Sequence, residues 1–268
     1  MSSVPCHPPD VDAALRRAAS VGPYFAISVG SVAPGATPPW LPVVDLYDPN
    51  GSGGLAMAIG TVGDRLNTRE RRVAASLFFQ GYAGRLWSPV IACLAADEIV
   101  PELGPNELSW RYLPDEPVAL QASAARGSVV PAGADRLRIA AELAFQSVVT
   151  SHLQPLTAAV RREVKIAEPL LWGNAASALV GAVGVLAGQL ENAHDVARTA
   201  RGVLTRLLDT GVLRQTGRLT IGRRGRLFFT RRSCCLYYRA PGGGLCGDCP
   251  LRTAKMSAAI ERPKVQGP

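Results

Sequence analysis

The sequence predicts a mainly α-helical protein with minor β structure, in which a helical domain precedes a small cysteine-rich C-terminal module. The first observation is composition: 47% of the 268 residues are hydrophobic and only 19% are charged, which excludes a disordered chain and allows a large core. The second is the helical hydrophobic periodicity that recurs through the middle of the chain. The third is the position of four of the six cysteines within sixteen residues near the C-terminus.

The N-terminal part, residues 1–54, is expected to be a loop-rich extension. A short helix is predicted over 10–20, with Asp10 as its N-cap after two prolines. Proline and glycine are frequent in residues 30–54, so that stretch is predicted to be loop with one strand at 41–47. The chain starts without a basic segment followed by an apolar one, so we expect no secretory signal and a cytoplasmic protein.

Residues 55–210 are expected to form the helical domain. The segment 67–70 resembles a capping box that opens a helix ending near Trp87, and Ser88 with Pro89 would then start a second helix. The remaining predicted elements are short strands and turns over 106–131 and amphipathic helices over 135–152, 156–166 and 193–209, the last of which stops at Gly211.

One segment is long enough to cross a membrane. Between Glu168 and Glu191 lie 22 residues without a charge. Its apolar content is largely alanine and glycine, which remove little hydrocarbon surface from water, and polar side chains interrupt it. We therefore predict a buried core helix. Peripheral association with the inner face of the membrane, through the basic stretch described next, stays open.

The net charge of +8 is concentrated in one segment. From Arg201 to Arg239 there are ten arginines and one acid, Asp209, so this stretch carries +9 and the rest of the chain −1. Such a local field attracts anionic partners and weakens with salt. Within it, residues 219–221 and 227–230 flank a glycine-containing turn and predict a β-hairpin.

The four clustered cysteines indicate a metal site. The spacing Cys-Cys-x10-Cys-x2-Cys closes around a metal only if the chain turns back, and the proline and glycines of 241–244 supply that turn. A structural zinc ion and a [2Fe–2S] cluster fit this spacing equally well, whereas a disulfide is disfavoured in a reducing compartment. The isolated Cys6 and Cys93 receive no role. The predicted ligands are Cys234, Cys235, Cys246 and Cys249.

The cysteine motif, preceded by Arg-Arg-Ser and followed by Pro-Leu, resembles the FhuF-like family of ferric-siderophore reductases. The sequences of residues 76–82, 87–89 and 171–175 also resemble the helical domain of that family, so the likeness covers roughly residues 60–255. The resemblance implies a [2Fe–2S] cluster on the four cysteines. It implies an oxidoreductase that reduces chelated Fe(III) by one electron, releases Fe(II), and takes its electrons from a donor protein or a small reductant.

Further site residues follow from this interpretation. Cations near an anionic cluster ease its reduction, and aromatic faces with polar tips suit a chelate pocket. The positive field is expected to attract ferric chelates with carboxylate or catecholate charge and acidic electron carriers. No general acid is required, so His7, His152 and His194 are interpreted as structural or exposed. The predicted tuning residues are Arg231, Arg232 and Arg239, and the predicted substrate contacts are Trp172, Asn174, Gln80, Tyr82, Arg85 and Trp87.

Two other interpretations stay open at this point. The helix at 193–209 and the basic hairpin resemble the last helix and wing of a winged-helix domain, which would suit an iron–sulfur redox regulator. The helix before them is too apolar to be exposed, so we expect no nucleic-acid partner. The other alternative is a siderophore-binding protein with a structural zinc site.

The expected C-terminal divisions are 211–256 for the hairpin and cluster module and 257–268 for a flexible tail.

Overall fold

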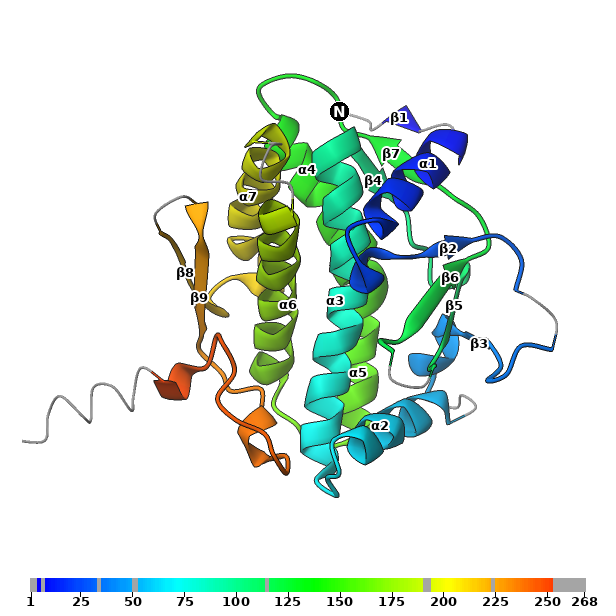
Figure 1. Cartoon of the computed structure of the whole chain (residues 1–268), viewed down its shortest axis with the longest axis vertical. Helices are drawn as coiled ribbons and strands as arrows, with labels where there is room; N and C mark the ends of the chain where they lie inside the picture. The colour runs from blue at the N-terminus through cyan, green and yellow to red at the C-terminus, as the bar shows by residue number, and fades with distance from the viewer. Residues whose placement is uncertain are drawn as a thin grey trace, which may run out of the picture.

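The computed structural model describes residues 4–5, 8–32, 35–49, 53–113, 116–189, 194–222 and 225–252. Its centre is a pair of long helices, α3 (Arg71–Asp97) and α6 (Glu168–Gln189), which lie side by side (Figure 1). The helix α7 (His194–Leu208) packs against both, and short strands lie at the periphery. The predicted class, mainly helical with minor β structure, is confirmed.

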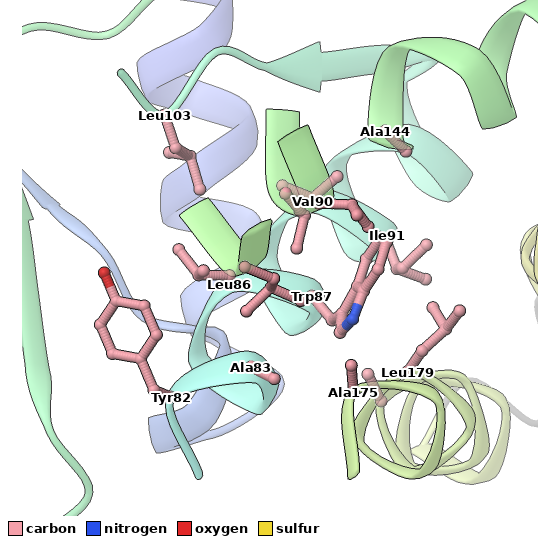
Figure 2. Close-up of a cluster of buried hydrophobic side chains, with 14 of the residues drawn as sticks. Tyr82, Ala83, Leu86, Trp87, Val90, Ile91, Leu103, Ala144, Ala175 and Leu179 are labelled. Carbon is pink, nitrogen blue, oxygen red and sulfur yellow. The ribbon is translucent and has the colours of Figure 1, made fainter. Parts of the chain in front are cut away.

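The contact between α3 and α6 forms the middle of the hydrophobic core. Trp87 is fully buried and points from α3 toward Ala175 and Leu179 of α6 (Figure 2). This core extends along the chain from Val11 to Phe229. It therefore contains side chains from both sides of the boundaries predicted at 54 and 210, and the division into domains stays a prediction.

The helix α6 is the one described helix that is long and apolar enough to cross a membrane. In its most apolar window 67% of the residues are buried inside the protein, mostly against α3 and α7. The predicted core helix is confirmed, because its apolar surface is used for internal packing.

The helix α3 is continuous, and the predicted break at Ser88 and Pro89 is wrong. The missing N–H and the ring of a proline inside a helix cost about 3 kcal/mol. Trp87, Val90 and Ile91 are fully buried around this point, and burial of each large side chain contributes about 1.5–3 kcal/mol. Packing on both sides of Pro89 therefore outweighs the local defect.

The predicted capping box at 67–70 is also wrong in detail. Glu70 is the N-cap of α3, and its side chain makes no capping hydrogen bond. Its backbone N–H instead donates to Thr68 Oγ1 at 3.2 Å. Asn67 takes a positive φ of 48° and turns the chain between α2 (Gly54–Arg65), a helix that the sequence did not predict, and α3.

The two helices predicted over 135–152 and 156–166 form one unbroken helical run. It consists of α4 (Arg136–Ala144), a π-helical stretch η3 (Phe145–Leu153) and α5 (Gln154–Glu163). The wider π turn places His152 in the core and leads into the first turn of α5, where a proline is tolerated.

The N-terminal half contributes two small sheets that lie on the right in Figure 1. The predicted helix over 10–20 is confirmed as α1 (Pro8–Ala19). The predicted strand over 41–47 is only two residues long, because a 3-10 turn, η2 (Val43–Leu46), follows it and buries Val43 and Leu46. One sheet has the order β1 (Val4–Pro5), β7 (Gly127–Val129), β4 (Ile99–Pro101), and the other β2 (Ser28–Val29), β6 (Ala119–Ala122), β5 (Leu108–Arg111), β3 (Leu41–Pro42).

The C-terminal part begins after α7 with a 3-10 turn, η4 (Gly211–Leu213), and continues into the predicted hairpin. The strands β8 (Gly217–Ile221) and β9 (Leu227–Arg231) pair antiparallel along their full length. The hairpin stands at the left edge of the molecule in Figure 1, and β9 contacts α6. The tail predicted at 257–268 lies outside the described residues.

Candidate metal centre

The four clustered cysteines are held between the end of β9 and a glycine-rich loop. The sulfurs of Cys235 and Cys246 lie 3.7 Å apart. Cys235 and Cys249 are buried, whereas Cys234 and Cys246 are half-buried, and none of the four forms a disulfide. The backbone N–H of Arg231 donates to the Asp248 carbonyl at 3.1 Å, which fastens the second cysteine pair to the strand that leads to the first.

Close packing of the backbone lets the loop turn back. A Cβ on Gly243 would stand 2.1 Å from the Tyr237 carbonyl oxygen, so only glycine fits there. The neighbouring Gly242 has a φ of +71°, in the left-handed region that favours glycine. The predicted turn at 241–244 is therefore present, with one glycine needed for space and another for backbone conformation.

The separation of the two closest sulfur atoms suits a tetrahedral metal bound by cysteine thiolates. Two thiolates on one tetrahedral metal, each about 2.3 Å from it, stand roughly 3.8 Å apart, close to the separation of Cys235 and Cys246. Across the described parts of the chain, no three His, Cys, Asp or Glu side chains converge as ligands of one metal ion. A [2Fe–2S] cluster needs two thiolates at each of two irons, and this donor set of four cysteines supplies them.

Arg231 is the cation in contact with the cysteines. Its side chain is only 1% exposed, and its Nη2 donates to Cys246 Sγ at 2.7 Å while its Nη1 donates to Asn174 Oδ1 at 2.5 Å. Burial alone would lower the pKa of Arg231, but the neighbouring Cys235 and Cys246 raise it above its ordinary value. The guanidinium therefore stays charged inside the protein.

The two closest thiols share one proton. Their mutual hydrogen bond lowers the pKa of Cys235 to about 5 and raises the pKa of Cys246 above its ordinary value. The charge of Arg231 favours the thiolate of both. Cys235 therefore favours the thiolate form that metals bind, whereas Cys246 has to lose its proton when a metal binds.

A buried polar network joins the cysteines to the two central helices. Asn174 Nδ2 of α6 donates to the carbonyl oxygen and to Oγ of Ser76 in α3, at 2.8 and 2.9 Å. Ser76 Oγ donates to the Cys235 carbonyl at 2.7 Å. Through Arg231, the same asparagine also reaches Cys246. The positions of both cysteines are therefore set by α3 and α6.

A cavity of about 650 Å³ borders two of the four clustered cysteines. It lies between α3, α6 and the segment 21–25, and Cys235 and Cys246 belong to its wall. Most of its surface is apolar, with Gln80 and Gln189 among its polar groups. Asp248, whose carboxylate accepts a hydrogen bond from Ser177, is the one charged side chain among the described residues that line it.

Comparison with known protein families matches both parts of this arrangement. Residues 76–210 match the family described as ferric iron reductase FhuF-like transporter. The chain belongs to the FhuF-like family. Residues 231–251, which include all four clustered cysteines, match the FhuF 2Fe-2S C-terminal domain. The cofactor of this FhuF-like protein is therefore a [2Fe–2S] cluster, in agreement with the donor set. No curated protein matches the chain.

Among the three arginines predicted to tune the FhuF-like cluster, only Arg231 touches a cysteine. Arg232 is exposed, with Nη1 3.5 Å from Gln215 Oε1. Arg239 is also exposed, and its Nη2 lies 2.5 Å from Glu70 Oε1 in an ion pair. Their tuning role stays a prediction without a contact behind it, because both side chains are bonded to other residues and solvent screens exposed charges.

Of the six predicted substrate contacts, only Gln80 lines the cavity. Tyr82 and Trp87 are fully buried in the core. Arg85 donates to the carbonyls of Pro23, Val118 and Ala26, and burial lowers its pKa to about 10. These three side chains stabilise the fold and do not reach the cavity.

The other two predicted contacts are also internal. Trp172 is 6% exposed, and its Nε1 donates to Glu168 Oε1 at 3.1 Å. Asn174 belongs to the network that holds the cysteines. Ser76 and Asp248 were not predicted as site residues, because no spacing in the sequence relates either of them to the cysteines. Cys6 and His7 lie outside the described residues.

Proposed function

We propose that this FhuF-like protein is a ferric-siderophore reductase. A ferric siderophore would occupy the cavity, receive one electron, and release its iron as Fe(II). The observation that carries the proposal is the position of Cys235 and Cys246, because two cysteines of the cluster domain form part of the wall of a cavity large enough for a chelate.

The residues of the chain prepare this transfer. The [2Fe–2S] cluster supplies one-electron chemistry. Arg231 places a positive charge and an N–H group against Cys246, which stabilises the additional negative charge after reduction. Asn174 and Ser76 hold that geometry. Fe(II) binds hard oxygen donors more weakly than Fe(III), so the electron itself loosens the chelate.

The charges around the cavity favour a neutral or cationic chelate. The basic stretch of the sequence was expected to attract anionic chelates, but no arginine or lysine is among the described residues of the cavity wall. Asp248 and the thiolates are negative. An anionic tricatecholate chelate would be repelled there, whereas an uncharged trihydroxamate chelate would not.

An iron-release assay tests the proposal. Anaerobic protein is reduced with dithionite, freed of reductant, and mixed with a ferric trihydroxamate and an Fe(II) trap. We expect Fe(II) from the wild type and from Cys93→Ser, and none from Cys235→Ser. Cys93 is the matched control because it is buried in α3 away from the cavity wall, with its pKa raised to about 12 by burial. Equal release by all three proteins would contradict the proposal.

We place the reaction in the cytoplasm as part of the same proposal. Unpaired cysteines and low-potential electron donors belong to a reducing compartment. Fractionation of cells that produce the protein tests this location, and recovery of the protein outside the cytoplasm would contradict it.

A further inference from the structure

The outward face of the β8–β9 hairpin combines positive charge with an exposed aromatic ring. Because side chains alternate along a strand, Leu219, Phe229 and Arg231 point inward, and the residues between them point outward. Phe228 on the outer side is 50% exposed, and the Arg226 guanidinium lies 5.2 Å above its ring. We call Arg218, Thr220, Arg226, Phe228 and Thr230 the hairpin face.

The charge on this face is not neutralised within the part of the chain that the structure describes. Arg218 and Arg226 are exposed and take part in no ion pair among those residues. Two other exposed arginines, Arg16 and Arg126, are each paired with a carboxylate. Arginine and aromatic side chains that are exposed together are typical of protein–protein interfaces.

The hairpin face also lies on the strand that leads to the cysteines. Phe228 precedes Arg231 by three residues in β9, which is about 10 Å along a strand. Arg231 in turn contacts Cys246. The cavity is lined by other elements, mainly α3, α6 and the segment 21–25. A partner on the hairpin face would therefore approach the cluster domain without occupying the substrate cavity.

We propose that the hairpin face docks an acidic one-electron carrier protein that reduces the cluster. This inference rests on the proposed reductase function. The carrier would lose one electron and leave oxidised, and the [2Fe–2S] cluster held by the four cysteines would accept that electron. Complementary charge accelerates such an encounter at low salt and has little effect at high salt. The two sites differ in charge: the described residues of the cavity wall include no cation and hold the chelate, whereas the hairpin face has cations and receives the carrier.

The test uses a plant-type [2Fe–2S] ferredoxin as an acidic probe. Reduced ferredoxin drives Fe(II) release from a ferric trihydroxamate by the holoprotein, and the second-order rate is measured at 20 and 200 mM NaCl. For the Arg218→Glu/Arg226→Glu variant we expect at least a tenfold loss of rate at low salt and little remaining salt dependence. Phe228→Ser is expected to lower the rate several-fold at both salt concentrations.

A matched control reverses two exposed arginines that lie outside the hairpin, in Arg16→Glu/Arg126→Glu. Its rate should stay within twofold of the wild type. All variants, reduced beforehand with dithionite, should release Fe(II) from the chelate as the wild type does. Failure of that release in the wild type overturns the reductase function itself.

Other outcomes overturn only the docking proposal. The first is that the wild type releases Fe(II) after dithionite reduction but releases none when reduced ferredoxin is the donor. The second is that the Arg218→Glu/Arg226→Glu variant releases Fe(II) with ferredoxin as fast as the wild type. Loss of binding to duplex DNA or to anionic vesicles in the hairpin variant, with unchanged ferredoxin kinetics, would assign the face to those partners instead.

Discussion

Arg231 shows how a single buried side chain links the helical body to the cluster domain. One end of its guanidinium contacts Cys246 and the other contacts Asn174, so the same group supplies charge and position. The sequence pointed to an arginine near the cysteines but did not distinguish Arg231 from Arg232 and Arg239. The difference lies in burial, because only Arg231 is the inward residue at the end of β9.

The first prediction concerns the reduction potential of the cluster. Arg231→Met removes a charge-assisted hydrogen bond to Cys246 and should lower the midpoint potential by on the order of 50 mV. Arg231→Lys should lower it less, because a charge remains. The measurement is a redox titration followed by electron paramagnetic resonance, with iron content determined on the same samples. Arg239→Met is the control, and a shift as large in this control would show that proximity in sequence, not contact, sets the potential.

The second prediction concerns acid stability. His152 is fully buried, with Nδ1 2.7 Å from the Tyr47 hydroxyl and Nε2 bonded to the Leu103 carbonyl. Burial lowers the pKa of His152 to about 4. Its neutral form is therefore favoured in the folded state, and the stability it contributes is present above pH 6.5 and lost as the pH falls toward 4.

Urea unfolding at pH 7.5 and pH 5.0 checks this. The wild type should lose about 2 kcal/mol of unfolding free energy between these values through this histidine. His152→Gln should be less stable at pH 7.5, with a smaller difference between the two pH values. An equal pH dependence in both proteins would mean that His152 is not the titrating group.

At the level of elements, helix periodicity predicted most helices, but their ends depended on tertiary contacts. The sequence suggested a new helix at Pro89, whereas packing on both sides of that residue keeps α3 whole. It also suggested two helices where a π-helical stretch joins α4 to α5. The hairpin was predicted well, because its turn and strand alternation are local in sequence.

The third prediction concerns the loop between the cysteine pairs. A methyl group on Gly243 would collide with the Tyr237 carbonyl, whereas a methyl group on Gly244 would meet no atom within 4 Å. Gly243→Ala should displace Cys246 and sharply reduce the iron and sulfide content of purified protein, and Gly244→Ala should keep both. The visible absorption of the cluster per protein is the measurement. Full cluster content in Gly243→Ala would show that the loop has another conformation.

At the scale of the whole molecule, the sequence predicted the amount of charge but not its place. The +9 segment and the cysteines are neighbours in sequence, so the arginines were expected around the substrate. The fold instead places exposed arginines of this segment on α7 and on the hairpin, and none of them is among the described residues that line the cavity between α3 and α6. The cysteine ligands were predictable because they are close in sequence. The contact of Ser76 with Asn174, and their role in holding the cysteines, was not predictable, since the two positions are 98 residues apart.

The fourth prediction follows from that placement. With dithionite-reduced protein, a neutral or cationic ferric trihydroxamate should release Fe(II) at least tenfold faster than an anionic ferric tricatecholate, because no described residue of the cavity wall is basic. Asp248→Asn should narrow the difference. Equal rates for the two chelates, or a faster tricatecholate, would contradict this account of the cavity.

We infer that a cluster on the four cysteines passes one electron to chelated iron in the neighbouring cavity. A single-turnover experiment tests it most directly: fully reduced protein without excess reductant is mixed with a ferric trihydroxamate, and the paramagnetic signal of the reduced cluster and trapped Fe(II) are followed together. We expect one Fe(II) for each reduced cluster, formed as the paramagnetic signal of the cluster disappears. A signal that persists while the chelate keeps its iron, or a purified protein that contains zinc and no sulfide, would contradict it.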